Sequence, residues 1–505
     1  MPNPLFDTLF APLENRATPV LILPDGTTIS GSAFFAMIAR AAGALRACGV
    51  EPGDRVAVQI AKTPEALAVY GAAVAVGAIF LPLNTAYTPS EVAYFVGNAT
   101  PKLVLGDPAQ IDALTPITAR HGARLMALGA DGTGDFTDLA KAQPDDMTVA
   151  NRTEDDLAAF LYTSGTTGRS KGAMLSQLNL LSNARALVDL WRFTADDVLL
   201  HALPIFHTHG LFVATHVALL SGASMVFLPG FDLDTMIRLM PQATSVMGVP
   251  TFYTRFLGDP RFNRDLTAHM RLFISGSAPL LAETHLDFEA RTGHRILERY
   301  GMTETNMITS NPYDGERRAG TVGFPLPGVE VKITDPATGA TLPRRETGMI
   351  EVRGPNVFQG YWQMPEKTRE ELRENGYFQT GDLGVVDAGG YLSIVGRQKD
   401  LIISGGYNIY PKEIELVLDA QPGVLESAVV GVPHPEFGEG VLAVLVPREG
   451  QGPDVNAIEA ALKTQLARFK QPKGYVIRDS LPRNTMGKVQ KNALREAYAD
   501  RLTKG

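Results

Sequence analysis

The sequence predicts an α/β fold with a large N-terminal domain of alternating strands and helices, a β-rich subdomain, and a small α+β C-terminal domain. Three observations support this prediction. Apolar runs of strand length alternate with segments of helical spacing up to about Gly320, short β-like runs between Gly and Pro follow, and a mixed segment begins at Gly390. Because parallel strands need crossover connections, the alternation predicts parallel sheets with helices on both faces.

Length and composition predict a large globular protein. A chain of 505 residues exceeds what one hydrophobic core supports, so two or three domains are expected. Hydrophobic content of 45% and charged content of 20% argue against disorder, and a net charge of −8 gives no reason to expect nucleic acid or an anionic membrane as partner. The single cysteine, Cys48, excludes an intrachain disulfide. With no apolar run of spanning length and no signal segment, we expect a cytoplasmic protein.

The first half of the chain shows the strand–helix alternation directly. In the first series, the expected elements are Ser30–Gly49, Val56–Ile60, Pro64–Val76, Ala78–Leu83, Glu91–Asn98 and Leu103–Leu105. The pattern resumes in a second series at Val198–Leu203, Phe212–Leu220, Ser224–Leu228, Thr235–Met240, Ser245–Val249 and Leu272–Ile274. Two similar halves are plausible from this order, although no sequence repeat is visible.

In the second half of the chain, short β-like runs and a mixed segment replace the strand–helix alternation. The β-like runs of the expected subdomain are Val329–Ile333, Met349–Val352 and Val357–Trp362. The mixed segment after Gly390 contains expected strands and helices at Leu392–Val395, Leu401–Ile403, Pro411–Gln421, Ser427–Val432, Val441–Val446 and Val455–Ala467. That segment has the size of a separate α+β domain.

One stretch, Thr163 to Gly172 with the sequence TSGTTGRSKG, carries the clearest chemical signal. It lies between the apolar run Leu157–Tyr162 and the helix-like Gln177–Trp191, so we expect a strand-to-helix loop, where α/β proteins hold ligands. Three glycines let backbone amides turn inward, hydroxyls add donors, and Arg and Lys add positive charge, which together suit a polyphosphate. The spacing is not that of a Walker A loop, and a flexible linker is disfavoured by the position between strand and helix.

These residues resemble the phosphate loop of the adenylate-forming enzymes, a family that includes acyl-CoA synthetases, firefly-type luciferases and the adenylation domains of peptide synthetases. The sequence departs from the family pattern at Tyr162, where the family has Ser, and at Ser170, where it has Pro. The resemblance covers essentially the whole chain. It implies ATP, Mg²⁺ and coenzyme A as ligands, a large domain at 1–396 that binds ATP and the acyl group, and a small mobile domain at 397–505 that carries a catalytic Lys and faces coenzyme A.

The resemblance assigns roles to the loop and to two further motifs. In the loop it implies nucleotide contacts by Thr163, Ser164, Gly165, Thr166, Thr167, Gly168 and Lys171. In the hexapeptide YGMTET, Glu304 is an oxygen ligand of the kind that Mg²⁺ takes, with Thr167 as second metal ligand, while Thr303 meets the α-phosphate and Tyr300 the nucleotide. Ser277, in SGSAP, belongs to a segment that packs along adenine. Outside this motif, Glu304 would be read as a solvated surface carboxylate.

The C-terminal motifs complete the family set. Asp382 in TGD and Arg397 in GRQKD are implied to reach the ribose, which suits a carboxylate because it accepts two hydrogen bonds. Lys399 is the implied pivot of the small domain. Lys488, in PRNTMGK, is implied to stabilise charge during adenylation. Expected contacts for coenzyme A are Gly405 and Gly406 for the pantetheine arm, and Lys470 and Lys473 for the phosphates.

Arg299 is the clue to the acid that is activated. Family members that take monocarboxylic acids commonly have an uncharged residue at this position, and a buried unpaired guanidinium is costly. A second substrate carboxylate would supply its partner, with Arg255 as a companion in the acyl pocket. Together with HALPIFHTHG around His207, which we expect to be catalytic and substrate-binding, this pattern is similar to malonyl-CoA synthetases. The alternative is that Arg299 is an ordinary surface residue that points outward to Glu298 or Glu304.

The expected function is therefore ATP-dependent ligation of malonate to coenzyme A through an acyl-adenylate. Another short acid, such as methylmalonate or a short monocarboxylate, is the nearest alternative. An adenylation enzyme that loads a carrier protein is a different class, disfavoured by the absence of an appended carrier segment. A nucleotide-binding protein without catalysis is disfavoured by Lys488 and Glu304. The oligomeric state stays open.

Overall fold

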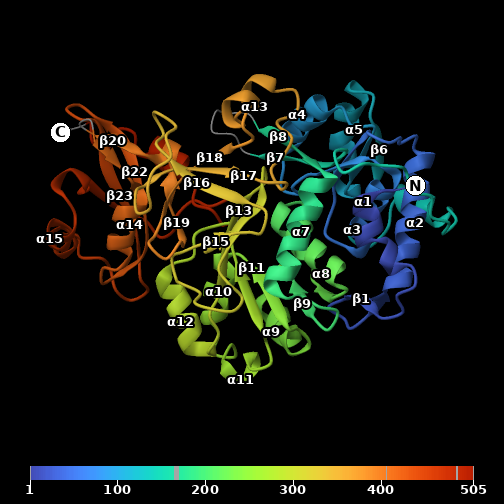
Figure 1. Ribbon diagram of the computed structural model, residues 1–505, viewed down its shortest axis with the longest axis horizontal. Helices are drawn as coiled ribbons and strands as arrows, with labels where there is room; N and C mark the ends of the chain where they lie inside the picture. Colours follow the sequence, from blue (N-terminus) through green and yellow to red (C-terminus); the bar gives the residue numbers. More distant parts are fainter. Residues whose placement is uncertain (1, 164–169, 405–406, 485–486, 504–505) are drawn as a thin grey trace. The chain divides into compact units, whose positions relative to one another are not determined.

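The computed structural model describes residues 2–163, 170–404, 407–484 and 487–503. The chain divides into two compact units, a larger one of residues 1–330 and 352–378 and a smaller one of residues 331–351 and 379–505. The expected α/β class is confirmed, with several sheets and many helices (Figure 1). The two compact units separate earlier in the chain than the predicted domain boundary between residues 396 and 397. That boundary remains a proposal about which residues move together.

A mostly parallel sheet forms the first part of the larger unit. Its described strands, in spatial order, are β6 (Arg124–Ala127), β5 (Leu103–Gly106), β3 (Arg55–Gln59), β4 (Ile79–Pro82), β7 (Leu157–Thr163) and β8 (Lys171–Ser176). All neighbours are parallel except β7 and β8. The core of this sheet packs Leu81, Val104 and Phe160 against Val92 and Phe95 of helix α4.

The first four helices of this part are capped at their N-termini by side chains. The elements are α1 (Pro4–Leu9), α2 (Gly31–Ala47), α3 (Pro64–Val76), α4 (Pro89–Ala99), α5 (Ile111–Arg120) and α6 (Asp135–Lys141). Helix α3, for example, is capped by the Thr63 side chain, starts with Pro64 and ends at Gly77, which takes the left-handed conformation at φ 73°. No helix of the described part of the chain is long and apolar enough to cross a membrane.

A second sheet follows in the larger unit. Its described strands, in spatial order, are β15 (Phe324–Pro325), β14 (Asn306–Ser310), β13 (Leu297–Met302), β12 (Leu272–Ser275), β11 (Ser245–Gly248), β9 (Val198–His201), β10 (Ser224–Phe227), β1 (Pro19–Ile22) and β2 (Thr28–Ser30). The strands from β13 to β1 run parallel. The helices along this stretch are α7 (Gln177–Trp191), the π-helix η3 (His209–Thr215), α8 (His216–Ser221), α9 (Leu233–Leu239), α10 (Pro250–Leu257), α11 (Arg264–Thr267) and α12 (Ala282–Thr292).

Two local expectations are wrong. The phosphate loop does not lead from a strand directly into a helix, because Lys171–Ser176 forms strand β8 against β7 before α7 begins. The six residues pair fully with β7, which buries most of them and outweighs their weak strand pattern. Val357–Trp362 is not a strand of a β-rich subdomain. Its end runs beside β8, where Tyr361 makes an isolated bridge with Ala173.

The smaller unit contains two antiparallel-rich sheets. The first has β16 (Glu330–Thr334), β17 (Gly348–Arg353), β18 (Phe378–Val386) and β19 (Leu392–Arg397), and the second has β21 (Tyr407–Ile409), β20 (Ile402–Ser404), β23 (Gly438–Pro447), β22 (Val424–His434) and β24 (Gly474–Ile477). Its helices are α14 (Pro411–Asp419), α15 (Val455–Gln465) and α16 (Lys491–Ala497). Alternate residues of β22 face opposite layers: Val429 packs toward α14 and α15, whereas Val430 packs toward Leu494 of α16.

Candidate active site

The phosphate loop is held at its base by strand pairing. Thr163 ends β7, Lys171 begins β8, and the two residues lie opposite each other in the hairpin. Between them, the predicted nucleotide ligands Ser164, Gly165, Thr166, Thr167 and Gly168 lie outside the described residues. The pairing therefore fixes the two ends of the loop side by side.

Glu304 lies at this base. It belongs to the turn between β13 and β14, next to Thr303, and its side chain is buried with 5% exposure. Its Oε1 accepts a hydrogen bond of 3.0 Å from the Tyr361 hydroxyl and one of 3.3 Å from Thr163 Oγ1. The structure thus brings Thr163, Thr303 and Glu304 together, and the reading of Glu304 as a solvated surface carboxylate is wrong.

The oxygen groups at this place fit Mg²⁺. That ion prefers octahedral oxygen coordination and usually takes one or two carboxylates with substrate phosphates and water. Glu304 supplies such a carboxylate, with the hydroxyl of Thr163 beside it. Within the described ranges, no group of three or more His, Cys, Asp and Glu side chains could hold a metal by itself. A metal bound together with nucleotide phosphates is the arrangement that this donor set suits.

Lys171, expected to contact phosphate, faces a carboxylate. Its Nζ lies 3.0 Å from Oε1 and 3.1 Å from Oε2 of Glu371, the last residue of helix α13 (Pro365–Glu371), and 4.1 Å from the centre of the Tyr361 ring. Sequence reasoning missed both Tyr361 and Glu371. No sequence motif connects these two residues with the loop, because Glu371 lies 200 residues after Lys171.

Arg299, on β13, is buried with 3% exposure. Among the described residues, its Nε and Nη2 have no hydrogen-bond partner. Burial lowers the pKa of Arg299 to about 9, so the guanidinium is still charged at neutral pH. A Cβ on Gly276 would lie 2.4 Å from Arg299 Cζ, so the guanidinium lies against the backbone just after β12. The alternative of an outward-pointing Arg299 is therefore wrong.

Neutral polar side chains surround this charge. His209 Nδ1 lies 3.2 Å from Ser277 Oγ, and its Nε2 is buried with no partner in the described part of the chain. Burial and the nearby Arg299 lower the pKa of His207 to about 4 and that of His209 well below its ordinary value. Both imidazoles are thus neutral at pH 7. Ser277, expected near adenine, takes a φ of 72° and contacts this cluster.

Arg255 does not join the cluster. It lies on α10 with its side chain exposed, and its guanidinium stacks over the Phe231 ring at 5.3 Å. On the same helix, Tyr253 and Phe256 turn inward and are fully buried. Arg255 follows Tyr253 by two residues, and residues two apart lie on opposite faces of a helix. The predicted pair of Arg255 with Arg299 is therefore not formed.

Three predicted residues come together in the smaller unit. Asp382 on β18 is buried and lies opposite Arg397 on β19, with 2.6 Å between Asp382 Oδ1 and Arg397 Nε. Lys488 lies close enough to interact with both. Burial and repulsion by Arg397 lower the pKa of Lys488 to about 8, and attraction by Asp382 partly opposes them. The pair and the lysine form a charged cluster within this unit.

The other C-terminal candidates are placed as follows. Lys399 lies exposed in the short 3₁₀ helix η5 (Gln398–Asp400), and burial of part of its side chain lowers its pKa. Gly405 and Gly406 lie outside the described residues. Lys470 pairs at 2.5 Å with a carboxylate of the same unit, whereas Lys473 is exposed.

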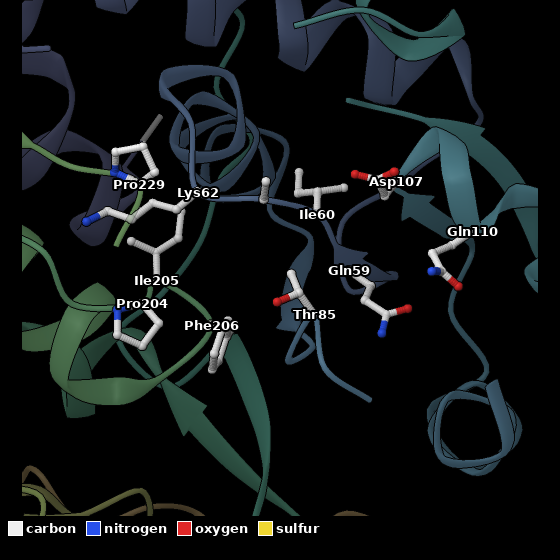
Figure 2. Close-up of a pocket in the computed structure, with 11 residues that line it drawn as sticks. Gln59, Ile60, Lys62, Thr85, Asp107, Gln110, Pro204, Ile205, Phe206 and Pro229 are labelled. Atoms are coloured by element: carbon white, nitrogen blue, oxygen red, sulfur yellow. The ribbon is translucent and has the colours of Figure 1, made fainter. Parts of the chain in front are cut away.

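A cavity of about 360 Å³ opens in the larger unit beside Phe206, the residue before His207 (Figure 2). Its lining combines polar groups with apolar surface, contributed by Gln59, Ile60, Ala61, Lys62, Thr85, Asp107, Gln110, Pro204, Ile205, Phe206 and Pro229. Lys62 Nζ donates a 2.8 Å hydrogen bond to the His201 carbonyl and lies 3.0 Å from His201 Nδ1. Burial lowers the pKa of Lys62 well below its ordinary value.

The chain matches the AMP-binding enzyme family over residues 12–362 and the AMP-binding enzyme C-terminal domain over residues 413–488. It therefore belongs to the AMP-binding enzymes, the adenylate-forming family that its motifs indicate.

Individual relatives show which members of the AMP-binding enzymes this chain is similar to. The crystal structure of ATP-bound MatB from Rhodopseudomonas palustris matches with a TM-score of 0.97 and 56% identity, covering 99% of this chain and 100% of that one. The malonate–CoA ligase of Arabidopsis thaliana is 36% identical, over 83% of this chain and 74% of its own length. The feruloyl-CoA synthase of an Amycolatopsis species is 35% identical, over 94% of both chains. The chain is thus similar to acid–CoA ligases, malonate–CoA ligases among them.

Proposed function

We propose that this protein is an ATP-dependent malonate–CoA ligase, which forms malonyl-CoA and releases AMP and pyrophosphate. The observation that carries the proposal is Arg299, a buried, charged guanidinium with two nitrogens that lack a partner among the described residues. A buried charge without a partner is costly, whereas a carboxylate can meet the guanidinium with two parallel hydrogen bonds. A dicarboxylic acid supplies one carboxylate for Arg299 and another for the reaction.

The support for malonate comes from Arg299 and its buried surroundings and not from overall similarity. Relatives named malonate–CoA ligase and feruloyl-CoA synthase are 36% and 35% identical to this chain, so identity does not separate a diacid from an aromatic acid. A monocarboxylic acid would leave Arg299 unpaired. The neutral His209 has a free Nε2 beside this charge within the described part, and can hydrogen-bond to the same carboxylate.

In the first half-reaction, a malonate carboxylate oxygen attacks the α-phosphorus of ATP, the bond from that phosphorus to its bridging oxygen breaks, and pyrophosphate leaves. We assign Lys488 to stabilise the negative charge that builds on the oxygens, because a preorganised ammonium lowers the energy of that charge. Thr303 donates to the α-phosphate. Mg²⁺ would be held by Glu304 and Thr167, and it would neutralise phosphate charge there.

The family motifs assign further residues to the nucleotide. Asp382 accepts hydrogen bonds from the ribose hydroxyls, and its contact with Arg397 at 2.6 Å orients the carboxylate. Tyr300 and Ser277 line the base. Thr163 fixes the first end of the phosphate loop through its contact with Glu304.

In the second half-reaction, the sulfur of coenzyme A attacks the acyl carbonyl carbon, the bond to the AMP oxygen breaks, and AMP leaves. The thiol proton passes to solvent. His207, whose pKa is lowered to about 4 by burial and the nearby Arg299, is a neutral imidazole at pH 7 and can hydrogen-bond to the reacting acyl group. The cavity beside Phe206 offers amide groups and apolar surface of the kind that a pantetheine arm needs (Figure 2). Gly405 and Gly406, which lie outside the described residues, are the pantetheine contacts that the family motif indicates.

The two half-reactions need different groups at the same carboxyl. We infer that residues 397–505 rotate about Lys399 between the steps and carry Lys488 away before the thiol enters. The exposure of Lys399 in a short 3₁₀ helix suits a pivot, because few contacts must break when its dihedral angles change.

Pyrophosphate release over a panel of acids tests the proposal. The panel contains malonate, methylmalonate, acetate, butyrate and ferulate, each assayed with coenzyme A and with a carrier protein as acceptor. We expect malonate with coenzyme A to give the highest kcat/KM. Preference for a monocarboxylic acid would remove the diacid assignment, and transfer only to the carrier protein would place the chain among carrier-loading enzymes.

A further inference from the structure

A closed series of contacts joins the two ends of the phosphate loop inside the larger unit. It begins at Lys171, passes through Glu371, Tyr361 and Glu304, and returns to Thr163, which lies opposite Lys171 in the hairpin. Two members of this series, Tyr361 and Glu371, have no part in the chemistry described above.

Lys171 contributes a buried charge to the series. Its side chain is 7% exposed, and its ammonium contacts both oxygens of Glu371 at 3.0 and 3.1 Å. A buried ammonium is stable only with a partner in good geometry. Glu371 meets that need, and the face of the Tyr361 ring at 4.1 Å adds a cation–π contact. Lys171 is thereby fixed at the second end of the loop.

Glu371 is ionised and fully engaged. Burial tends to raise its pKa, but hydrogen bonds from Tyr361 and Lys171 outweigh burial and lower the pKa below the ordinary value. The Tyr361 hydroxyl donates to its Oε2 at 2.6 Å, and Lys367 on the same helix contributes a further contact at 3.1 Å.

Tyr361 connects the two carboxylates. Its hydroxyl oxygen is 2.6 Å from Glu371 and 3.0 Å from Glu304. Its backbone is also fixed, because it bridges to Ala173 of β8 and the next residue, Trp362, donates a 2.8 Å hydrogen bond to the Gly172 carbonyl. The hydroxyl therefore stands at a defined point and shares its single proton between the two carboxylates, so that Glu304 is held beside Thr163.

We propose that Tyr361 and Glu371 are positioning residues for the nucleotide-bound metal. Glu371 anchors Lys171 and the Tyr361 hydroxyl, and Tyr361 holds the Glu304 carboxylate beside Thr163, at the first end of the phosphate loop. This inference rests on the proposed function, in which Glu304 is a ligand of Mg²⁺. A correctly held carboxylate binds the metal without first losing side-chain freedom, so metal and nucleotide binding strengthen each other.

The test measures ATP binding by titration calorimetry in the absence of malonate, so that no turnover occurs. The Kd for ATP is determined with and without Mg²⁺, and the ratio of the two values reports how much the metal strengthens binding. Tyr361→Phe removes the hydroxyl and keeps the ring over Lys171. Glu371→Gln removes the charge. The matched control is Glu366→Gln, on the same helix, where the side chain is 79% exposed.

We expect the Mg²⁺-dependent gain in affinity to fall about tenfold in Tyr361→Phe and in Glu371→Gln, while the Kd measured without Mg²⁺ and the KM for malonate change little in Tyr361→Phe. Glu366→Gln should behave as the wild type. An unchanged gain in folded Tyr361→Phe, or an equal loss of ATP affinity with and without Mg²⁺, would overturn the inference.

Glu304→Gln separates this inference from the proposed function. Loss of the Mg²⁺-dependent gain in Glu304→Gln, together with a full gain in Tyr361→Phe and Glu371→Gln, would leave Glu304 as the metal ligand and remove only the positioning role. A full gain in Glu304→Gln would show that the metal assignment itself fails, and the positioning role with it.

Discussion

Gly276 and Arg299 are packed so closely that no other residue fits at position 276 without moving the guanidinium. A Cβ at Gly276 would lie 2.4 Å from Cζ and 2.5 Å from Nη1 of Arg299. The backbone after β12 thus forms one wall against the flat face of the guanidinium. Nε and Nη2 of Arg299 are buried and have no partner in the described part of the chain.

Arg299→Met should reduce malonate turnover and stabilise the free protein. Loss of a buried charge pair with substrate costs about 3 kcal/mol or more, which lowers kcat/KM for malonate roughly 100-fold or more. Removal of an unpaired buried charge should raise the unfolding free energy without ligand by about 1–4 kcal/mol. Steady-state kinetics and thermal unfolding measure the two effects.

Arg255→Ala is the control for Arg299→Met. Arg255 is exposed and stacks on Phe231, so its removal should leave the KM for malonate within about twofold and ATP affinity unchanged. A large rise in the malonate KM for Arg255→Ala would restore the two-arginine pocket that the sequence predicts.

Gly276→Ala should mimic the loss of Arg299 without changing its charge. The added methyl group must displace the guanidinium, so kcat/KM for malonate should fall at least tenfold while the Kd for ATP stays the same. Kinetics with malonate and calorimetry with ATP distinguish these effects. Wild-type malonate kinetics would mean that Arg299 shifts without functional cost and is not in contact with substrate.

Lys488 should control adenylation and its pH dependence. Lys488→Ala should abolish formation of malonyl-AMP but leave transfer from supplied malonyl-AMP to coenzyme A nearly intact, because only the first step needs the ammonium. The lysine is charged below its pKa of about 8 and neutral above it. The kcat/KM for ATP in pyrophosphate release should therefore fall as pH rises through about 8.

Lys488→Arg provides the control for this pH effect, since a guanidinium keeps its charge to much higher pH. Its residual adenylation activity should not decline near pH 8. Equal damage to both half-reactions in Lys488→Ala would instead assign Lys488 a structural role.

Lys399→Pro should slow thioester formation more than adenylation. Pro fixes φ at the proposed pivot, so the rotation before the second step becomes unfavourable while the adenylating arrangement stays accessible. The two half-reactions are measured separately, with Lys399→Ala as the control for loss of the side chain alone. A second step that proceeds at the wild-type rate in Lys399→Pro would place the pivot at another residue.

Part of this fold was readable from the sequence because it depends on local patterns. The helices Pro64–Val76 and Gln177–Trp191 have the predicted bounds, since apolar periodicity and capping residues are properties of neighbouring positions. The β8 strand at Lys171–Ser176 was missed, because its pairing with β7 depends on contacts across the loop.

Motif chemistry on contiguous residues likewise indicated the family, which the family match confirms, whereas the roles of Glu304, Asp382 and Lys488 stay predictions. Only the tertiary structure decided which side chains are partners. Arg299 is buried against Gly276, with Nε and Nη2 unpaired among the described residues, whereas Arg255 is turned away by the helix it lies on. Tyr361 and Glu371 reach the phosphate loop from a segment far along the chain, and burial makes each of these long-range contacts strong.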